Sequence, residues 1–458
     1  MKVNKLMFRE YDIRGIYNED INEEVSYLIG RAFASRMKDF GLSKTVLGYD
    51  NRLSSPVIEE NLLKGLVESG ITVYRLGLVT TPMCYFAANF YDVNCSMMIT
   101  ASHNPKEYNG FKFSYNGIHN AFGDEVRKLY EIIEKNNFVD GKGKIINKNI
   151  TEDYIKLIIE KLNFGKRKVK VVYDCGNGTT SIIADTIFDK LNITKIPLYN
   201  ISDGNFPNHH PDPSVEKNLE DLKKTVLKNK ADLGIAFDGD GDRVGVVDEK
   251  GNMIDIDKYL IIMWRYLVDK VEKKEGFFDV KCSKALYDEL LKLGVKPVET
   301  RTGNSYTRKI SNDNNYPLGG ELSGHIYYRD KFPGYDDGIY AGIRLIERLS
   351  HTKENLSELL NGINKYYSTK ELKVQVDDEI KFDVVREIEE YCKSRGYNIL
   401  TIDGVKAKFE DGSALVRASN TGPNITMRYE AKTKTRLKEI SDEFNNLLED
   451  IIKKKESR

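Results

Sequence analysis

Short apolar segments alternate with helical segments through most of the sequence, and this rhythm constrains the fold more than any other feature. Residues 45–49 and 71–76 read as strands on either side of a helix, with Ser55 as its expected N-cap and Gly70 as its expected stop. Strand–helix–strand units of this kind favour mostly parallel sheets. Because the alternation restarts twice further along the chain, we expect three α/β units in series.

The second and third units restart near residues 168 and 256, and the pattern changes again near residue 366. The last part combines short extended pieces with two helices, which favours a smaller α+β domain, and its lysine-rich end reads as a frayed tail. We place the expected domains at 1–148, 149–252, 253–365 and 366–458. The expected strands are 168–173, 233–237, 244–247, 277–280 and 372–376, and the expected helices are 179–191, 256–271, 283–293, 384–394 and 435–453.

The charges of the chain balance, with 70 Lys and Arg against 70 Asp and Glu, whereas nucleic-acid binders usually carry a basic excess. We therefore expect no nucleic-acid partner. No apolar run approaches the roughly 20 residues of a membrane helix, and Arg9 and Glu10 interrupt any signal-peptide core, so we expect no membrane association. Five dispersed cysteines suit a reducing compartment. These features predict a cytoplasmic protein, a monomer or a weak homo-oligomer.

Four apolar segments run into conspicuous polar loops, and the first such loop is Ile99-Thr-Ala-Ser-His-Asn-Pro105. A serine just past a strand is well placed to act as a nucleophile, although the G-x-S-x-G elbow of many hydrolases is missing. Asn-Pro is also a turn former, so a simple strand stop explains this loop about equally well. His103 could likewise serve only to hydrogen-bond the loop.

The second loop, Phe237-Asp-Gly-Asp-Gly-Asp-Arg243, carries three aspartates separated by glycines. Their carboxylates can converge on one hard cation, while the glycines let the backbone fold tightly around it. An EF-hand is the competing metal site, but its sixth position holds Arg243 in place of glycine, and its flanks read as strands. Three monodentate aspartates leave coordination positions open, which suits Mg²⁺ bound partly through a phosphate.

The third and fourth loops carry polar groups that suit a phosphorylated sugar. Gly319-Gly-Glu-Leu-Ser-Gly-His325 offers a carboxylate and a hydroxyl two residues apart, which can bind neighbouring sugar hydroxyls, and a histidine that can transfer a proton near pH 7. Arg417-Ala-Ser-Asn-Thr-Gly-Pro423, followed by Arg428, has the composition of a phosphate-binding turn. Each loop alone also fits a structural turn. Together they predict one cleft at the carboxyl ends of strands.

These four loops resemble those of the α-D-phosphohexomutase superfamily, and within it the bacterial phosphomannomutase/phosphoglucomutase group. The resemblance covers nearly the whole chain and also includes residues 8–15, 109–112, 174–178, 206–213 and 279–282. It implies an α/β fold of four domains, three related mixed-sheet domains and a smaller C-terminal α+β domain. It also implies reversible interconversion of hexose 1-phosphate and hexose 6-phosphate, of mannose or glucose, with a hexose 1,6-bisphosphate as intermediate and activator.

The resemblance implies a role for each loop. Ser102 would carry the phosphoryl group, and Ser102, Asp238, Asp240 and Asp242 would bind one Mg²⁺. A phosphoserine carries about −1.5 to −2 charges at pH 7, so beside three aspartates it demands a cation. The implied catalytic residues are Ser102, His103, Lys112, Arg243 and His325. The implied substrate-binding residues are Tyr11, Arg14, Lys281, Asn304, Glu321, Ser323, His325, Arg417, Ser419, Asn420, Thr421 and Arg428.

Asn304 departs from the group, which usually has a histidine at this position. We therefore assign proton transfer to His325 and expect Asn304 to be at most a polar contact to substrate. The Ser-Asn-Thr sequence from Ser419 resembles the hexose-phosphate group, whereas phosphoglucosamine mutases resemble Ser-Gly-Thr. Three alternatives stay open: a phosphoglucosamine mutase, a sugar-phosphate-binding protein that has lost turnover, and a phosphohydrolase that uses the aspartates.

Overall fold

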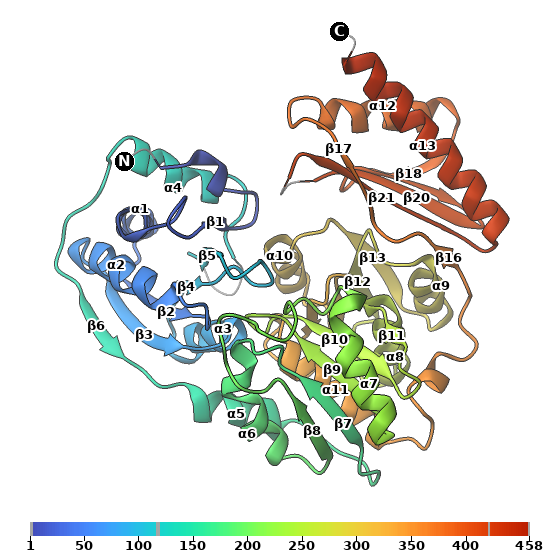
Figure 1. Cartoon of the computed structure of the whole chain (residues 1–458), viewed down its shortest axis with the longest axis horizontal. Coiled ribbons are helices and arrows are strands. Elements are labelled where there is room, and N and C mark those ends of the chain that lie inside the picture. Colours follow the sequence, from blue (N-terminus) through green and yellow to red (C-terminus); the bar gives the residue numbers. More distant parts are fainter. Residues whose placement is uncertain (1–2, 116–119, 420–421, 457–458) are drawn as a thin grey trace.

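The computed structural model describes residues 3–115, 120–419 and 422–456, which form four sheets in chain order (Figure 1). We call the parts of the chain around these sheets domains I to IV. The first three sheets combine parallel and antiparallel strands, whereas the fourth is antiparallel in all its pairs. The predicted fold class, three mixed-sheet α/β domains and a smaller α+β domain, is confirmed.

Domain I has the strand order β1-β5-β4-β2-β3-β6, with β5 antiparallel to both of its neighbours. The expected N-cap of α2 is wrong by one residue: Ser54 is the N-cap, and the Ser55 hydroxyl instead donates to Asp50 at 2.7 Å. The elements are η1 (Lys5–Met7), β1 (Ile13–Ile16), α1 (Glu23–Asp39), β2 (Lys44–Tyr49), α2 (Ser55–Glu68), β3 (Thr72–Leu78), α3 (Thr81–Phe90), β4 (Ser96–Ile99), β5 (Tyr108–Ser114), α4 (Asp124–Glu134) and β6 (Lys144–Asn147).

Domain II has the strand order β11-β10-β9-β7-β8. The helix expected over 179–191 is broken into a 3-10 turn and α6 at Ile183, whose φ of −137° is not helical. The elements are α5 (Thr151–Glu160), β7 (Lys170–Asp174), η2 (Thr179–Ile182), α6 (Ala184–Asp189), β8 (Thr194–Leu198), η3 (Glu216–Leu219), α7 (Glu220–Asn229), β9 (Leu233–Phe237), β10 (Val244–Asp248) and β11 (Met253–Ile254).

Domain III has the strand order β13-β12-β14-β15. Its first helix ends at Leu267, earlier than expected, where the Lys270 N–H closes a tight turn onto the Leu267 carbonyl. The elements are α8 (Ile256–Leu267), β12 (Glu275–Asp279), α9 (Lys284–Lys292), β13 (Lys296–Thr300), α10 (Asn304–Asn314), β14 (Leu318–Gly320), β15 (Ile326–Tyr328), α11 (Gly338–Ser350) and η4 (Ser357–Leu360).

Domain IV covers one antiparallel sheet with two helices (Figure 1). The tail expected to fray is helical through Glu456, and Lys455 pairs with Glu387 of α12 at 2.6 Å. The elements are β16 (Tyr367–Ser368), β17 (Leu372–Gln375), α12 (Lys381–Ser394), β18 (Asn398–Leu400), β19 (Val405–Phe409), β20 (Gly412–Ala418), β21 (Asn424–Ala431) and α13 (Lys434–Glu456).

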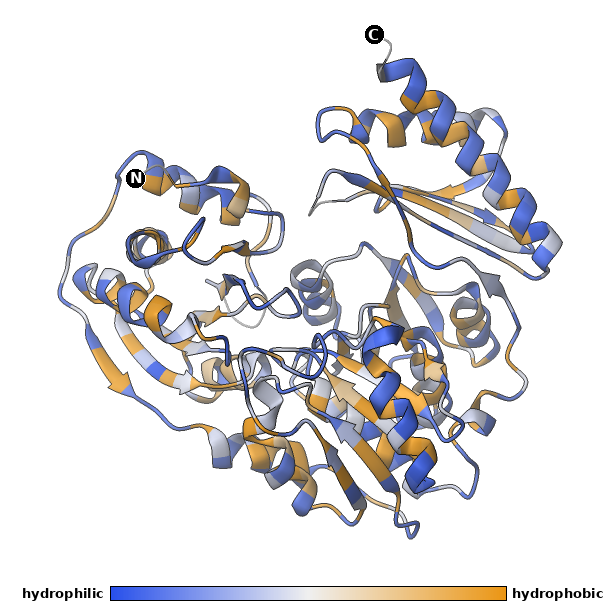
Figure 2. Cartoon of the chain, viewed as in Figure 1, coloured by the Kyte–Doolittle hydropathy of each residue, from blue (hydrophilic) through white to orange (hydrophobic). Residues whose placement is uncertain are grey.

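The buried apolar side chains show how the domains are joined. One cluster runs through domains I, II and III and includes Trp264 of α8 and Leu345 of α11. Helix α11 belongs to domain III but also packs against β9 and β10 of domain II. A separate cluster within residues 376–451, which includes Leu448, is the core of domain IV. Figure 2 shows hydrophobic residues along the sheets in both parts. We call domains I–III, which share the first cluster, the body; domain I also has a second cluster of its own, and the core of domain IV is separate from both.

The four polar loops occupy equivalent places in the four sheets. In each of domains I–III the loop connects a parallel strand to an antiparallel neighbour, β4 to β5, β9 to β10, and β14 to β15. The fourth loop connects β20 to β21. In the described part of the chain, none of the helices has the length and apolar character that a membrane span requires.

Candidate active site

The four loops line one cleft of about 900 Å³, to which all four domains contribute. Ser102, Asp238, Asp240 and Asp242 are buried, at most 1% exposed. Asn420 and Thr421 lie outside the described residues. The other expected residues line the cleft: Tyr11, Arg14, His103, Lys112, Arg243, Lys281, Asn304, Glu321, Ser323, His325, Arg417, Ser419 and Arg428.

Ser102 lies on a tight turn after β4 and adopts a left-handed backbone conformation, with φ of 51°. Such a conformation is costly for a residue with a side chain. Its N–H donates to the Thr100 hydroxyl at 2.8 Å, and its hydroxyl donates to Asp238 Oδ2 at 2.8 Å. The His103 Nδ1 lies 3.3 Å from the same hydroxyl. Burial and the nearby guanidinium of Arg243 lower the pKa of His103 well below its usual value, which keeps its imidazole neutral.

A buried arginine holds this turn in place, and the sequence reasoning missed it. The Arg52 guanidinium donates to the carbonyls of Ser102 at 2.8 Å and Asn104 at 2.7 Å, and also to those of Pro105 and Tyr108. A signal was available, because Arg52 follows β2 in the same way that the site loops follow their strands. Arg52 thus stabilises the turn in which Ser102 has its unfavourable φ angle.

The second loop, residues 237–243, which we call the aspartate loop, approaches the turn at Ser102 closely because it contains glycines. A Cβ on Gly239 would lie 2.5 Å from the Ser102 carbonyl oxygen, which no larger residue would tolerate. Gly241 has a φ of 83°, a conformation that favours glycine. The Gly241 N–H donates to Asp238 Oδ1 at 3.0 Å, so the loop folds back on its own first carboxylate. The glycines therefore bring the aspartates to the serine.

The three carboxylates are compressed into one buried cluster. Burial and mutual repulsion raise the pKa of Asp238 and of Asp242. The Lys112 ammonium contacts Asp240 Oδ2 at 2.8 Å and Asp242 Oδ2 at 2.5 Å. Burial alone would lower the pKa of Lys112, but these carboxylates raise it well above its usual value. One ammonium group thus offsets part of a charge that three carboxylates share.

The residues present fit a divalent cation of the Mg²⁺ type. Ligand oxygens of Asp238, Asp240 and Asp242 lie within 4.8 Å of one another. Among the described atoms, Asp240 Oδ1 and Asp242 Oδ1 are buried without a hydrogen-bond partner, a costly state for a carboxylate oxygen unless a cation binds it. All these donors are hard oxygens, which Mg²⁺ prefers.

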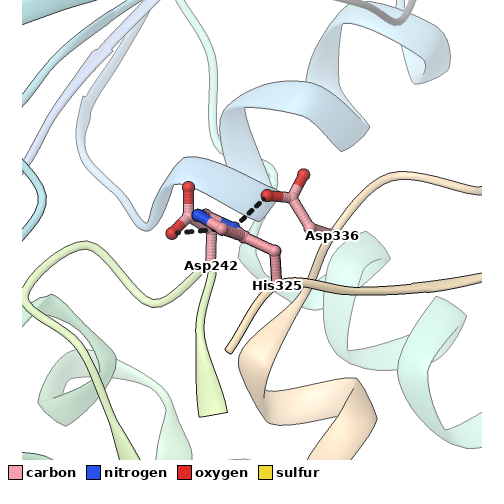
Figure 3. A group of neighbouring side chains, drawn as sticks. All are labelled: Asp242, His325 and Asp336. Carbon is pink, nitrogen blue, oxygen red and sulfur yellow. Dashed lines mark hydrogen bonds and ion pairs between the residues drawn. The ribbon is translucent and has the colours of Figure 1, made fainter. Parts of the chain in front are cut away.

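His325 lies between the carboxylates of Asp336 and Asp242 (Figure 3), and both of its ring nitrogens have partners. Its Nδ1 lies 2.7 Å from Asp336 Oδ2, and its Nε2 accepts from the Arg243 Nε at 2.9 Å. This pattern requires the Nδ1–H tautomer, with the proton toward Asp336. The Asn304 amide also donates to Asp336, so Asn304 contacts the partner of His325. The arrangement links His325 to Arg243, a role that sequence reasoning did not consider, and it adds Asp336 to the cluster.

The third loop, residues 319–325, which we call the sugar loop after the role expected for it, is anchored through the carboxylate of Glu321. Glu321 Oε1 accepts from the Gly303 N–H at 2.6 Å and from the Thr307 hydroxyl at 2.9 Å. Burial raises the pKa of Glu321. Ser323, two residues later, lines the cleft as well. Across the cleft, the Tyr11 hydroxyl of domain I donates to the Thr302 carbonyl at 2.7 Å.

A buried lysine holds two residues of the fourth loop in place, and sequence reasoning missed it. The Lys381 ammonium, on α12, donates to the Ser419 carbonyl at 2.6 Å and the Gly422 carbonyl at 3.1 Å. Arg417, at 8% exposure, donates from Nε to Asp403 Oδ2 at 3.0 Å and still lines the cleft. The sequence near Lys381 does not indicate this role, because its two carbonyl partners lie about 40 residues away along the chain, whereas its local hydrogen-bond partner is Asp378 at 2.6 Å.

The cleft therefore has two chemically different ends. The buried end in domains I and II combines the Ser102 hydroxyl, a candidate cation site and a lysine. The end formed by domains III and IV presents the cationic side chains of Lys281, Arg417 and Arg428. Such an arrangement can bind an anionic ligand at one end while a group is transferred at the other.

Sequence comparisons relate the chain to one family over its whole length. Models of the phosphoglucomutase/phosphomannomutase family match it in order: alpha/beta/alpha domain I over residues 5–140, domain II over 152–251, domain III over 255–366, and the C-terminal domain over 371–447. A phosphomannomutase/phosphoglucomutase of Pseudomonas syringae pv. tomato is 40% identical over 448 residues, 97% of this chain and 95% of that protein. A Pseudomonas aeruginosa protein of the same name is 39% identical over 445 residues, 97% of this chain and 96% of its own.

A solved structure gives the same relation. A phosphoglucomutase/phosphomannomutase family protein from Burkholderia thailandensis superposes with a TM-score of 0.92 at 34% sequence identity, covering 98% of each chain.

Proposed function

The chain belongs to the phosphoglucomutase/phosphomannomutase family, and we propose that it interconverts hexose 1-phosphates and hexose 6-phosphates of mannose, glucose or both. The names of the Pseudomonas relatives, which include both activities, support this breadth of substrate. The observation that carries the proposal is the Ser102 hydroxyl, 2.8 Å from the aspartate cluster and beside a cleft to which four domains contribute.

Ser102 is the proposed phosphoryl carrier. In the first half of the reaction, the bond from phosphorus to Ser102 Oγ breaks and a bond forms to the free hydroxyl oxygen of the sugar, whose proton is transferred to the departing Ser102 Oγ. The product is a hexose 1,6-bisphosphate. In the second half the bisphosphate lies in the opposite orientation, its other phosphate returns to Ser102, and the sugar hydroxyl that is released regains a proton. A trace of hexose 1,6-bisphosphate would first phosphorylate Ser102 and so activate the enzyme.

Asp238, Asp240 and Asp242, with an oxygen on Ser102, are the proposed ligands of one Mg²⁺, which would supply positive charge to the transferring phosphoryl group. Lys112 and Arg243 add fixed positive charge beside the same serine and aspartates. His103, neutral and 3.3 Å from Ser102 Oγ, is placed to exchange its proton. His325 completes the proposed catalytic set, and its contact orients Arg243.

The remaining residues are proposed to hold the sugar and its second phosphate. Glu321 and Ser323 offer acceptors and a hydroxyl to sugar hydroxyls, and Asn304 lies beside them in the same cleft. The phosphate that is not reacting would be bound by the fourth loop. The proposed set is Tyr11, Arg14, Lys281, Asn304, Glu321, Ser323, His325, Arg417, Ser419, Asn420, Thr421 and Arg428. We also propose domain boundaries at 148, 252 and 365, a cytoplasmic location, and a monomer or weak homo-oligomer.

The first experiment follows glucose 1-phosphate and mannose 1-phosphate separately by phosphorus NMR, with Mg²⁺ and catalytic glucose 1,6-bisphosphate. Appearance of the 6-phosphates supports the mutase, and the two rates give the sugar preference. A matched sample with EDTA tests the metal: turnover should cease and return with excess Mg²⁺. Release of inorganic phosphate alone would indicate a phosphohydrolase. No change with either sugar would contradict the proposal and leave a glucosamine-phosphate mutase or a binding protein without turnover.

A further inference from the structure

Thr302, in the loop between β13 and α10, connects three domains through its own polar groups. Its N–H donates to Asp403 Oδ2 of domain IV at 2.9 Å, and its carbonyl accepts from Tyr11 of domain I at 2.7 Å. Its hydroxyl donates to Asp279, at the end of β12 in domain III, at 3.1 Å. We call this loop segment, residues 301–303, the junction. Both peptide groups at Thr302 are thus used between domains.

The junction is fixed tightly against domain I. Gly303 has a φ of 133°, and a Cβ there would lie 2.4 Å from the Tyr11 ring. Its N–H also donates to Glu321, so the next peptide is fixed to the sugar loop. Any displacement of the junction must therefore disturb Tyr11 or Glu321, both of which line the cleft.

Asp403 connects β20, the strand that carries Arg417, to the junction. Its Oδ2 accepts from both the Thr302 N–H and the Arg417 Nε, at 2.9 and 3.0 Å. Its side chain is 7% exposed and that of Arg417 is 10% exposed, so the ion pair is largely removed from water. A guanidinium has five N–H donors in one plane. Because the contact with Asp403 uses only Nε, it restrains the guanidinium and leaves the two terminal nitrogens outside this bond.

We propose that Asp403 is a positioning residue, which orients Arg417 toward a substrate phosphate and couples that orientation, through Thr302, to Tyr11 in domain I. This inference rests on the proposed function, because it takes the ligand of Arg417 to be the phosphate of a hexose phosphate. Asp403 acts through Arg417 and Thr302 and does not itself contact substrate.

The other contacts between domains III and IV explain why such a coupling matters. Glu299 pairs with Lys406 at 2.8 Å and with Lys408, and Glu430 accepts from Ser283 and from the Lys284 N–H. Polar interfaces of this kind separate more readily than apolar ones. Asp403 takes part in this polar seam through Thr302 and also bonds Arg417 of β20. Binding of the phosphate and closure of the seam then favour each other.

Hydrogen exchange tests the coupling without any substrate. Asp403→Asn keeps an oxygen of the same size but removes the charge, and Asp403→Ala removes both. We expect faster amide exchange in the peptide that covers residues 301–303 and in the peptide that covers Tyr11, more in the alanine variant than in the asparagine variant. The matched control is Asp411→Asn, which loses a pair with Arg436 in the same domain. Exchange at Tyr11 that is unchanged in both Asp403 variants would overturn the coupling.

Binding and kinetics test the orientation of Arg417. Loss of a charged hydrogen-bond partner typically costs about tenfold to a hundredfold, so we expect Asp403→Ala to weaken glucose 1-phosphate binding by that factor in calorimetry. KM should rise in parallel and kcat should change little, and Asp403→Asn should lie between the alanine variant and the wild type. More hexose 1,6-bisphosphate should escape per turnover in both variants, measured by phosphorus NMR.

The outcomes separate this inference from the proposed function. A wild-type chain that does not bind glucose 1-phosphate or turn it over contradicts the proposed function, whereas the exchange experiment still tests the coupling. A wild-type chain that binds and turns over the sugar, with unchanged affinity and unchanged bisphosphate release in both Asp403 variants, overturns the positioning role. If Asp403→Ala does not fold, Asp403→Asn carries the same comparison against Asp411→Asn.

Discussion

The seam between domains II and III is apolar, whereas the seam between domains III and IV is polar. In the first, α11 packs onto the neighbouring sheet, and one hydrophobic cluster continues through domains I–III. In the second, Glu299, Asp403 and Glu430 each bond across the interface, and domain IV keeps a hydrophobic core of its own. Ser102 and the three aspartates thus belong to the body, and Arg417 belongs to the domain with a separate core.

This difference suits the two tasks that we propose for the cleft. Phosphoryl transfer depends on positioning and preorganised charge, which a continuous core provides. The fourth loop must bind either phosphate of the intermediate, and a domain joined by polar contacts can adjust to both. The comparison predicts that substitutions in the body change the chemical step or the stability of the body, whereas substitutions in domain IV change binding or the stability of that domain alone.

The largest effect is expected from Ser102→Ala. Because this change removes the proposed phosphoryl carrier, turnover should fall by more than the roughly 10²–10³-fold that loss of a single transition-state contact typically costs. Intact mass spectrometry after incubation with glucose 1,6-bisphosphate should show one added phosphoryl group on the wild type and none on the variant. Ser202→Ala, an exposed serine of domain II, is the control and should keep both properties. Phosphate retained on the Ser102 variant would place the carrier elsewhere.

A matched pair of leucines tests whether the two parts unfold separately. Leu345 in the body and Leu448 in domain IV are both buried in helices, and a Leu→Ala change in such a site costs about 2–5 kcal/mol of unfolding free energy. The chain has one tryptophan, Trp264, in the body, so its fluorescence reports on domains I–III, whereas circular dichroism reports on the whole chain.

In urea, Leu345→Ala should lower the midpoint of the fluorescence transition. Leu448→Ala should leave that midpoint in place and produce an earlier transition seen by circular dichroism alone. If both variants instead shift one shared transition equally by both probes, the two cores unfold as a unit and the comparison between body and domain IV fails for stability.

Each strand and helix that the sequence analysis placed overlaps an element of the structure, because hydrophobic periodicity records burial locally, but many other elements were not placed. It placed the four loops correctly in the cleft, since each follows an apolar strand. It failed where tertiary contacts override local pattern. The helix expected from residue 179 is interrupted at Ile183, whose φ of −137° is not helical, and the local pattern does not show this break. Lys381 was missed because it binds backbone carbonyl groups, which every residue has, so these partners leave no signal in the sequence. Arg52 also binds carbonyl groups, and only its place after β2 could have indicated it.

His325 illustrates a second limit. A histidine in a glycine-rich loop predicts proton transfer by its ordinary pKa alone. In the structure, the two ring nitrogens of His325 bond Arg243 and Asp336. Asp336 lies eleven residues away, in a loop that carries no motif. Which nitrogen of a histidine is engaged depends on neighbours that only the folded chain brings together.

A smaller effect, on binding, is expected from Arg417→Ala. Because the phosphate that is not reacting contributes equally in the ground state and the transition state, its loss should raise KM with little change in kcat. A charged hydrogen bond of this kind is worth about 1.5–3 kcal/mol, or roughly tenfold to a hundredfold in KM. Steady-state kinetics with glucose 1-phosphate measure both constants. Arg436→Ala, which loses pairs with Asp411 and Glu439 and a contact with the Phe409 ring, is the control. A fall in kcat at constant KM would assign Arg417 to the chemical step.

The smallest effect is a pH dependence confined to the body. The His209 side chain bonds Asp174, the last residue of β7 in domain II, at 3.0 Å. Burial alone would lower the pKa of His209, but the hydrogen bond and the charge of Asp174 outweigh burial, and the pKa is raised. The native state therefore holds this proton more tightly than the unfolded chain does. The stability contributed by the pair is complete below about pH 6.5, the ordinary histidine value, and is lost as pH rises through the raised pKa.

His209→Gln removes this titration, so the difference in unfolding free energy between wild type and variant should be largest near pH 6 and should shrink toward pH 9. The difference should be visible in the Trp264 fluorescence transition, because His209 lies in domain II of the body. Domain IV should show no such trend, since its core contains neither residue of the pair. A difference that grows with pH would reverse the sign of the linkage, and an equal trend in domain IV would show that the polar seam transmits stability as an apolar one does.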